Sequence, residues 1–234
     1  QGFHDHRVFA NYGLILKDLG KLKEAELSQR KAIELKPDFA EAHSNLAIIL
    51  SYLGKLEEAE LSTRKAIELK PDFADAHSNL GNILKDLGKL KEAELSLRKA
   101  IQLDPDLAKA HCNLGNLLGN LGKLKEAELS TRKAIALKPD FAEAHSNLGT
   151  ILKDLGKLEE AELSTRKAIG YRPDFVEAHF NLGSLLSDFG NLLEAELATR
   201  KAIELRPDFA RAYSNLSAIL MDNGKSREAE LAAR

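Results

Sequence analysis

Residues 37–71 decide the fold, and they read PDFAEAHSNLAIILSYLGKLEEAELSTRKAIELKP. Pro37 stops a preceding helix, because its ring lacks an N–H and clashes with the turn before it. Asp38 is predicted to cap the next helix by accepting one of its free N–H groups. That helix is expected to run to about Leu53, where Gly54 supplies the left-handed residue at which helices commonly end.

A second helix is predicted from about Leu56 to Leu69, and both helices carry an apolar stripe. Leu46 and Leu50 belong to the stripe of the first helix, at helical spacing. Small residues such as Ala59 dominate the stripe of the second, so the two helices can approach closely. One hairpin of this size cannot bury both stripes, and neighbouring hairpins must therefore stack into a solenoid.

The same pattern recurs every 34 residues along the chain. The prolines keep this period: Pro37, Pro71, Pro105, Pro139, Pro173 and Pro207. So do the glycines that end the first helices: Gly20, Gly54, Gly88, Gly122, Gly156, Gly190 and Gly224. The predicted fold class is all-α, a solenoid of antiparallel helix pairs. After a lead-in at 1–5, the repeats are placed at 6–39, 40–73, 74–107, 108–141, 142–175 and 176–209, with a partial repeat at 210–234.

The last repeat stops inside its second helix, so the chain is expected to be part of a longer protein. Its 234 residues include 34 basic and 36 acidic side chains, a balance that argues against a nucleic-acid surface. The apolar runs are too short to span a bilayer, and the N-terminus does not resemble a secretory signal. A cytoplasmic protein without membrane insertion is predicted. The single Cys112 cannot form an internal disulfide.

The spacing resembles that of the tetratricopeptide repeat family. Besides the 34-residue length, Leu46, Ala47, Ala59, Ala66 and Pro71 occupy the signature places of that family. The resemblance implies a right-handed superhelix in which the first helices line a concave groove. It also implies a module that binds other polypeptides and performs no chemistry itself.

Within the family, two strings are similar to the repeats of O-GlcNAc transferase and to arrays in cyanobacterial proteins. They are KAIELKPDFADAHSNL at 65–80 and AHSNLGNILKDLGKL at 76–90. The sequence departs from the family pattern where large aromatic residues are usual. Histidine stands at most of these places in the first helices, and threonine at most of those in the second.

One asparagine per repeat stays constant while its neighbours change. A carboxamide both donates and accepts hydrogen bonds, so a row of them predicts a ladder that pairs with the backbone of a bound peptide. Two alternatives stay open: each asparagine ties its helix to the backbone of the next repeat, or the repeats are recent duplicates. The predicted peptide-binding residues are Asn11, Asn45, Asn79, Asn113, Asn147, Asn181 and Asn215.

An acidic row lies two residues before the terminating glycines. Because a carboxylate there opposes the helix dipole, helix stability does not explain it. We expect these residues to line the groove and to favour cationic ligand side chains, with solvated pairs to neighbouring lysines as the alternative. The row comprises Asp18, Asp86, Asp154, Asp188 and Asp222. The residue before each asparagine is predicted to tune the groove: Ser44, Ser78, Cys112, Ser146, Phe180 and Ser214.

Two further rows are interpreted as structural. The histidines, His43, His77, His111, His145 and His179, lie on the apolar stripe and are expected to pack rather than bind metal. A leucine row lies nearly opposite the stripe of the second helices: Leu27, Leu61, Leu95, Leu129, Leu163, Leu197 and Leu231. An exposed apolar ridge is one interpretation. We favour the other, in which the second helices rotate slightly and bury these leucines between repeats.

The sequence shows no phosphate loop, nucleophile elbow or paired metal ligands, so neither catalysis nor a cofactor is predicted. The predicted function is a non-catalytic module that binds an extended peptide or protein segment in its groove. A second hypothesis is the substrate-recognition arm of a larger glycosyl- or sulfotransferase. A third is a scaffold that self-associates.

Overall fold

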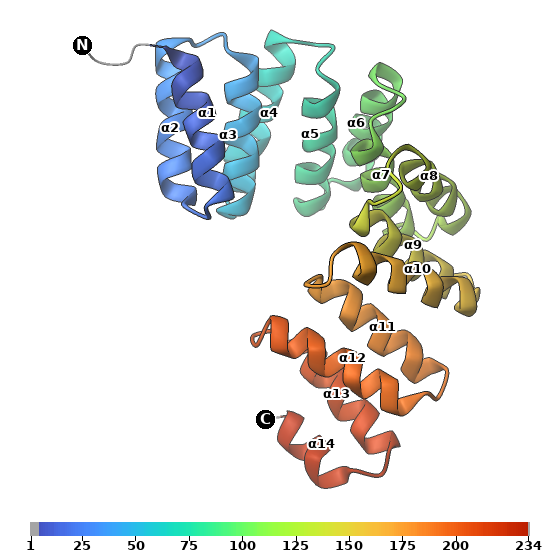
Figure 1. Ribbon diagram of the computed structural model, residues 1–234. Helices are drawn as coiled ribbons and strands as arrows, with labels where there is room; N and C mark the ends of the chain where they lie inside the picture. Colours follow the sequence, from blue (N-terminus) through green and yellow to red (C-terminus); the bar gives the residue numbers. More distant parts are fainter. Residues whose placement is uncertain (1–4, 234) are drawn as a thin grey trace. The chain divides into compact units, whose positions relative to one another are not determined.

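The computed structural model describes residues 5–233, which form α-helices joined by short turns (Figure 1). The helices follow one another as antiparallel pairs, so the all-α array of helix pairs predicted from the sequence is confirmed. The first helices of the pairs are α1 (His6–Asp18), α3 (Ala40–Tyr52), α5 (Ala74–Asp86), α7 (Ala108–Asn120), α9 (Ala142–Asp154), α11 (Val176–Asp188) and α13 (Ala210–Asp222). The second helices are α2 (Leu22–Leu35), α4 (Leu56–Leu69), α6 (Leu90–Leu103), α8 (Leu124–Leu137), α10 (Leu158–Tyr171), α12 (Leu192–Leu205) and α14 (Ser226–Ala233).

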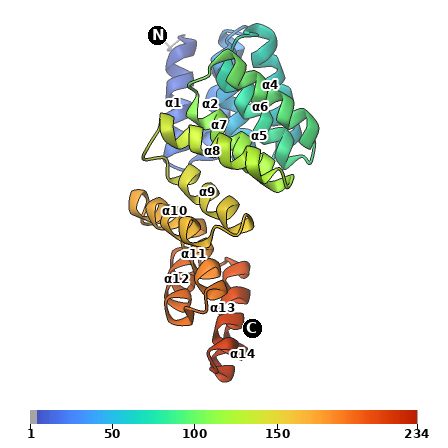
Figure 2. The ribbon, with the colours of Figure 1, turned by 90° about the vertical axis from the view of Figure 1, so that its right-hand side faces the viewer.

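The chain divides into two compact units, one ending at Leu117 and one beginning at Leu118. In the first unit α1 to α6 stack in chain order (Figure 1). In the second unit α9 to α14 do the same, as the two views together show (Figure 2).

The first helices end as their glycines predict. Gly54 has a φ of 74°, and its N–H donates to the carbonyl of Ser51 at 3.0 Å. The N–H of Lys55 donates to the carbonyl of Leu50 at 2.9 Å. These two bonds form a Schellman motif, which satisfies the last free carbonyls of α3.

The predicted cap by Asp38 is wrong. The N-cap of α3 is Phe39, and no side chain caps the helix there. Asp38 lies one residue too early, because the helix begins only at Ala40. A different side chain closes this turn: the Nε2 of His43 lies 2.9 Å from the carbonyl oxygen of Pro37. Because a carbonyl only accepts, Nε2 is the donor.

Each core cluster draws on consecutive repeats, as a solenoid requires. In the first unit, Leu46, Leu50 and Ala59 pack with Ile33 of the repeat before and Ile83 of the repeat after. In the second unit, Leu182, Leu186 and Ala195 pack in the same way with residues of the neighbouring repeats. The buried stripe of the second helices is made of alanines that are 0% exposed, among them Ala59 and Ala195.

The leucine row of the second helices is exposed, so the favoured prediction that it is buried is wrong. The exposed fractions are 68% at Leu27, 69% at Leu61, 69% at Leu95, 74% at Leu129, 59% at Leu163, 68% at Leu197 and 66% at Leu231. The reason is geometric. Each leucine follows a fully buried alanine by two residues, which is a rotation of about 200° around the helix. Burying that alanine points the leucine outward.

No helix among residues 5–233 is long and apolar enough to cross a membrane.

Candidate functional site

The predicted ladder asparagines lie on the first helices, and their exposure differs along the row. Asn11 is exposed. Asn79 is only 6% exposed. The other five are half-buried: Asn45, Asn113, Asn147, Asn181 and Asn215. The half-buried positions place a carboxamide at the surface while one side of it packs against the protein.

Several of these amides donate to the serine that lies 35 residues earlier, in the preceding repeat. The Nδ2 of Asn113 lies 3.2 Å from the Oγ of Ser78, and the Nδ2 of Asn181 lies 3.3 Å from the Oγ of Ser146. The asparagine therefore does tie adjacent repeats together, although it bonds a side chain and not the backbone. Asn215 differs, because its Nδ2 donates to the Oγ1 of Thr199 in the preceding second helix at 3.3 Å.

The serines that accept these bonds are buried. Ser44 and Ser146 are 3% exposed and Ser78 is 0% exposed. They hold the asparagine side chains in place and do not themselves reach the surface. Cys112, at the corresponding place in the fourth repeat, is also buried, whereas Ser214 is exposed.

Asn79 is enclosed by host groups on both ends of its amide. Its Nδ2 donates to the Oγ of Ser44 at 3.4 Å, and its Oδ1 accepts from the Nζ of Lys109 at 2.9 Å. Burial lowers the pKa of the Lys109 ammonium, while the charge of Asp75 opposes that change. Asn79 consequently acts as part of a buried polar contact, unlike the half-buried members of the row.

The second unit has a cavity of about 190 Å³ on the face of the first helices. Asn181 and Phe180 of α11, Asp154 of α9 and Arg211 of α13 line it, with Lys153 beside them. Three predicted rows therefore meet at one place: the asparagines, the acidic residues, and the residues that precede the asparagines.

Ring contacts hold Arg211 and Phe180 in this cavity, and a hydrogen bond holds Lys153. The guanidinium of Arg211 lies 5.0 Å from the centre of the Phe180 ring, within the range of a cation–π contact. The ring centres of Phe180 and Phe209 are 5.2 Å apart. The Nζ of Lys153 lies 2.8 Å from the Oγ of Ser184.

Arg211 was missed as a site residue in the sequence. It carried a recognisable signal, because most repeats have an acidic residue at its position. Those acidic residues are Glu41, Asp75, Glu143 and Glu177; the other basic residues there are Arg7 and Lys109, of which Lys109 encloses Asn79.

The acidic residues at the ends of the first helices are exposed, and several pair with lysines. Lys17 lies 3.1 Å from Asp18, and Lys85 lies 3.5 Å from Asp86. Asp188 lies 2.8 Å from Lys153 of the preceding repeat. Asp222 is exposed as well. Solvated charge pairs thus account for much of this row, and Asp154 is the member that lines a cavity.

The histidines serve the turns between repeats. In each of five repeats the Nε2 lies within 3.0 Å of the carbonyl oxygen of the proline six residues earlier; the histidines are His43, His77, His111, His145 and His179. Among residues 5–233, no group of three potential ligand side chains could hold a metal ion.

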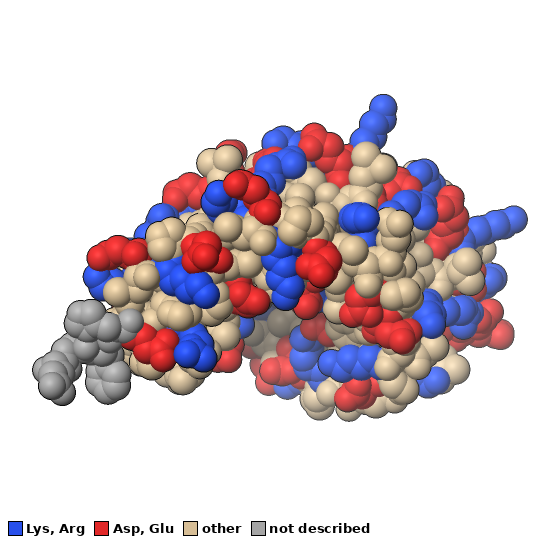
Figure 3. Space-filling model, turned by 90° about the horizontal axis from the view of Figure 1, so that it is seen from above, with Lys and Arg blue, Asp and Glu red and all other residues tan. Residues whose placement is uncertain are grey.

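An ion-pair ladder joins successive second helices. Glu60 accepts from Lys89 at 2.7 Å and pairs with Arg64 at 2.8 Å, and Arg64 also reaches Glu92 at 3.0 Å. Hydrogen bonds from Lys89 and then Arg64 hold the pKa of the Glu60 carboxyl below its usual value, against the opposing effect of burial. The molecular face in Figure 3 accordingly shows acidic and basic side chains interspersed.

Stacked helical hairpins, each packed on the next, define an α-helical repeat array. Models described as tetratricopeptide repeat match residues 6–39, 29–60, 108–141, 131–162 and 147–208. A model described as TPR repeat matches residues 49–88 and 81–122. The chain therefore belongs to the tetratricopeptide repeat family.

Solved structures share this fold. A chain of the APC/C hetero-tetramer Cut9–Hcn1 matches with a TM-score of 0.87 and 18% identity, over 93% of this chain and 43% of that one. The chain thus spans less than half of that relative. PilF of Pseudomonas aeruginosa matches with a TM-score of 0.70 and 22% identity, over 82% and 89% of the two chains.

YrrB, whose structure is described as a TPR protein with an unusual peptide-binding site, matches with a TM-score of 0.55. The two chains are 29% identical, and the match covers 79% of this chain and 95% of YrrB. Comparison with curated protein sequences gives no match.

Proposed function

We propose that the face of the first helices binds an extended peptide segment of another protein, with the half-buried asparagines pairing to the peptide main chain. The observation that carries the proposal is the cavity of the second unit, where Asn181 lies beside Phe180, Arg211 and Asp154. An amide, an aromatic ring, one carboxylate and two basic groups in one hollow can recognise both the backbone and the side chains of a peptide.

The hydrogen bonds of Asn181 fix what it offers to a ligand. Its Nδ2 donates to Ser146 and to the Oγ1 of Thr150, each at 3.3 Å. Both N–H groups are thereby directed toward the protein, and the Oδ1 is the group that accepts from a peptide N–H. The host bonds orient the amide before a ligand arrives, which reduces the ordering cost of binding.

The spacing of the repeats suits an extended ligand. Packed helices lie roughly 8–10 Å apart, and an extended chain rises about 3.3 Å per residue. One asparagine would then meet a peptide main-chain group at about every third residue. Side chains between these points are free to contact the charged groups of the cavity.

The charged groups of the cavity set a preference for ligand side chains. Asp154 favours a basic side chain, and Arg211 favours an acidic one. A peptide that carries both charges a few residues apart satisfies both groups.

The family assignment supports this function, because tetratricopeptide repeat proteins bind protein and peptide partners. YrrB, at 29% identity, is described as having a peptide-binding site. The finer resemblance to O-GlcNAc transferase repeats stays a prediction of the sequence.

A peptide library screened on the purified chain tests the proposal. The best peptide would then be titrated calorimetrically against the native chain and against Asn181→Ala and Arg211→Ala. Each change should raise the Kd at least about tenfold, because each removes one charge-assisted or main-chain hydrogen bond to the peptide.

Asn191→Ala is the matched control, since Asn191 bonds Glu194 at the start of α12 and does not line the cavity. It should leave the Kd unchanged. A screen that selects no peptide, or a selected peptide that binds the two cavity variants as tightly as the native chain, would refute the proposal.

A further inference from the structure

The second helices of the second unit expose a row of leucines at regular spacing. We call Leu129, Leu163, Leu197 and Leu231 the leucine ridge; each is between 59% and 74% exposed. A row of large apolar side chains that recurs once per repeat is more than the scattered exposure normal for a protein surface.

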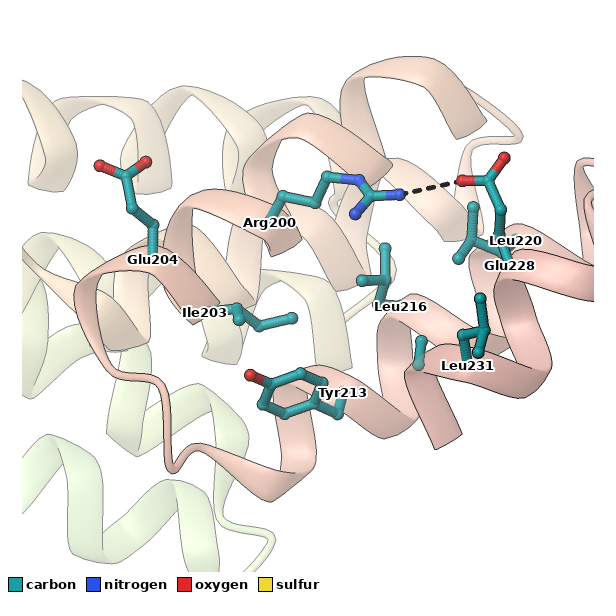
Figure 4. A pocket seen from close by; sticks show the side chains of 9 residues that line it. Arg200, Ile203, Glu204, Tyr213, Leu216, Leu220, Glu228 and Leu231 are labelled. Carbon is teal, nitrogen blue, oxygen red and sulfur yellow. Dashed lines mark hydrogen bonds and ion pairs between the residues drawn. The ribbon is translucent and has the colours of Figure 1, made fainter. Parts of the chain in front are cut away.

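Apolar cavities lie between successive second helices, beside members of the leucine ridge. One cavity of about 470 Å³ lies between α12 and α14, with Leu216 and Leu220 of α13 as its floor and Ile203 and Leu231 at its sides (Figure 4). The ion pair of Arg200 and Glu228, at 3.3 Å, crosses its rim (Figure 4).

The same cavity recurs one repeat earlier, between α10 and α12. It measures about 460 Å³, and Ile169, Leu182, Leu186 and Leu197 line it. Each of these residues stands 34 positions before its counterpart in the first cavity. Two of the ridge leucines, Leu197 and Leu231, therefore line successive apolar hollows.

This periodicity narrows the choice of partner. A molecule that fills successive hollows needs one apolar side chain for each helical repeat. Another array of the same repeats has the required spacing by construction.

The charges beside the ridge also favour a second copy. Glu194 lies three residues before Leu197, and Lys201 lies four residues after it; the preceding repeat has Glu160, Leu163 and Lys167 in the same order. Within the chain, Glu160 pairs with Arg132, Glu194 with Arg166 and Lys201 with Glu204. When two such helices cross antiparallel, the lysine of each also faces the glutamate of the other. The surface is therefore complementary to itself in one orientation.

We propose that the second helices are a self-association surface, at which two copies of this chain pack antiparallel with the ridge leucines of each in the apolar hollows of the other. Such two-fold contacts use the same patch on both partners. Four leucines and the aliphatic stems of their charged neighbours offer an apolar patch on the order of several hundred Å² per copy. Stable interfaces bury about 800 Å² per partner, so a dimer of moderate affinity is expected.

Sedimentation equilibrium of the native chain over about 1 to 500 µM provides the test. The native chain should form a dimer, and the triple variant Leu129→Gln, Leu163→Gln, Leu197→Gln should raise the dimer Kd at least about 100-fold. Because these side chains are exposed, the variant should keep its helical circular dichroism. A control triple, Leu19→Gln, Tyr52→Gln and Met221→Gln, removes apolar groups that are 57–68% exposed but lie at the ends of first helices; it should dimerise normally.

The charge pattern gives a second test that does not alter the leucines. Lys167→Glu with Lys201→Glu should weaken the dimer, and Glu160→Lys with Glu194→Lys should weaken it too. An equimolar mixture of these two double variants should restore dimerisation, because each then presents the opposite charge to its partner.

A native chain that stays monomeric at 500 µM overturns the proposal. So does a dimer that survives the leucine triple, or a mixture of the charge variants that remains monomeric. None of these results affects the peptide-binding proposal, which concerns the face of the first helices.

Discussion

Replacing Gly81 by alanine probes how closely the two helices of one repeat approach. A methyl group on Gly81 would lie 2.5 Å from the Cγ of Leu97 and 2.8 Å from its Cδ2, well inside a normal carbon–carbon contact. It would also lie 3.2 Å from the carbonyl oxygen of Ala93. Leu97 is 1% exposed, so its side chain cannot move aside into solvent.

Two opposing effects set the size of the change. Overpacking a filled core costs about 1–3 kcal/mol, whereas alanine is favoured over glycine inside a helix by about 1 kcal/mol. The expected net result is a free energy of unfolding lower by about 1 kcal/mol. Gly170→Ala is the matched control, because nothing lies within 4 Å of the added methyl group. That variant should be stabilised by up to about 1 kcal/mol.

The second repeat accommodates an alanine and a threonine at the two places that Gly81 and Leu97 occupy in the third. There Ala47 stands where Gly81 stands, and Thr63 stands where Leu97 stands; Thr63 is 0% exposed, and its hydroxyl donates to the carbonyl of Ala59 at 2.8 Å. The double variant Gly81→Ala, Leu97→Thr should therefore be less destabilised than the sum of its single changes, by about 1 kcal/mol or more.

Urea denaturation measures these free energies, and hydrogen exchange at the amides of α5 and α6 locates the effect. The reasoning about close packing fails if Gly81→Ala stabilises the chain as much as Gly170→Ala does. It fails equally if the two changes at positions 81 and 97 are additive.

Two other predictions concern polar contacts. Asn79→Ala should lower the free energy of unfolding by about 1–3 kcal/mol, because it removes a buried amide that bonds the buried Ser44 hydroxyl and the Lys109 ammonium. Asn45→Ala should cost a few tenths of a kcal/mol; equal melting temperatures for the two variants would contradict the enclosure of Asn79. Stability should also fall with acid, because the pKa values of Glu60, Glu128 and Glu196 are lowered first by hydrogen bonds from the lysines of the following repeats. Such groups stabilise the fold at pH values above their ordinary pKa of 4.5, and this stabilisation is lost as the pH falls below it, since the unfolded chain binds protons first. The urea midpoint measured from pH 7 to pH 3 should drop over the acid part of this range, and less steeply for Glu60→Gln; a midpoint independent of pH would exclude the mechanism.

The sequence also pointed toward the candidate site, but only in part. The asparagine row, the acidic row and the row of residues before the asparagines were recognisable from their period. One member of each row lies at the same cavity: Asn181, Asp154 and Phe180. A tie between repeats was one of the alternatives, but the enclosure of Asn79 in particular was not specified, because its acceptor and donor contacts come from repeats on either side. Such contacts depend on how adjacent hairpins are rotated, which no local pattern specifies.

The sequence by itself determined the helices, because their ends depend on local backbone chemistry. Gly54 takes a positive φ and closes α3 whatever lies beyond it. Only the tertiary structure decided what the remaining faces do. The leucine ridge is exposed and its hollows are open because packing fixes the rotation of each second helix, and that rotation is set by neighbouring repeats and not by the segment itself.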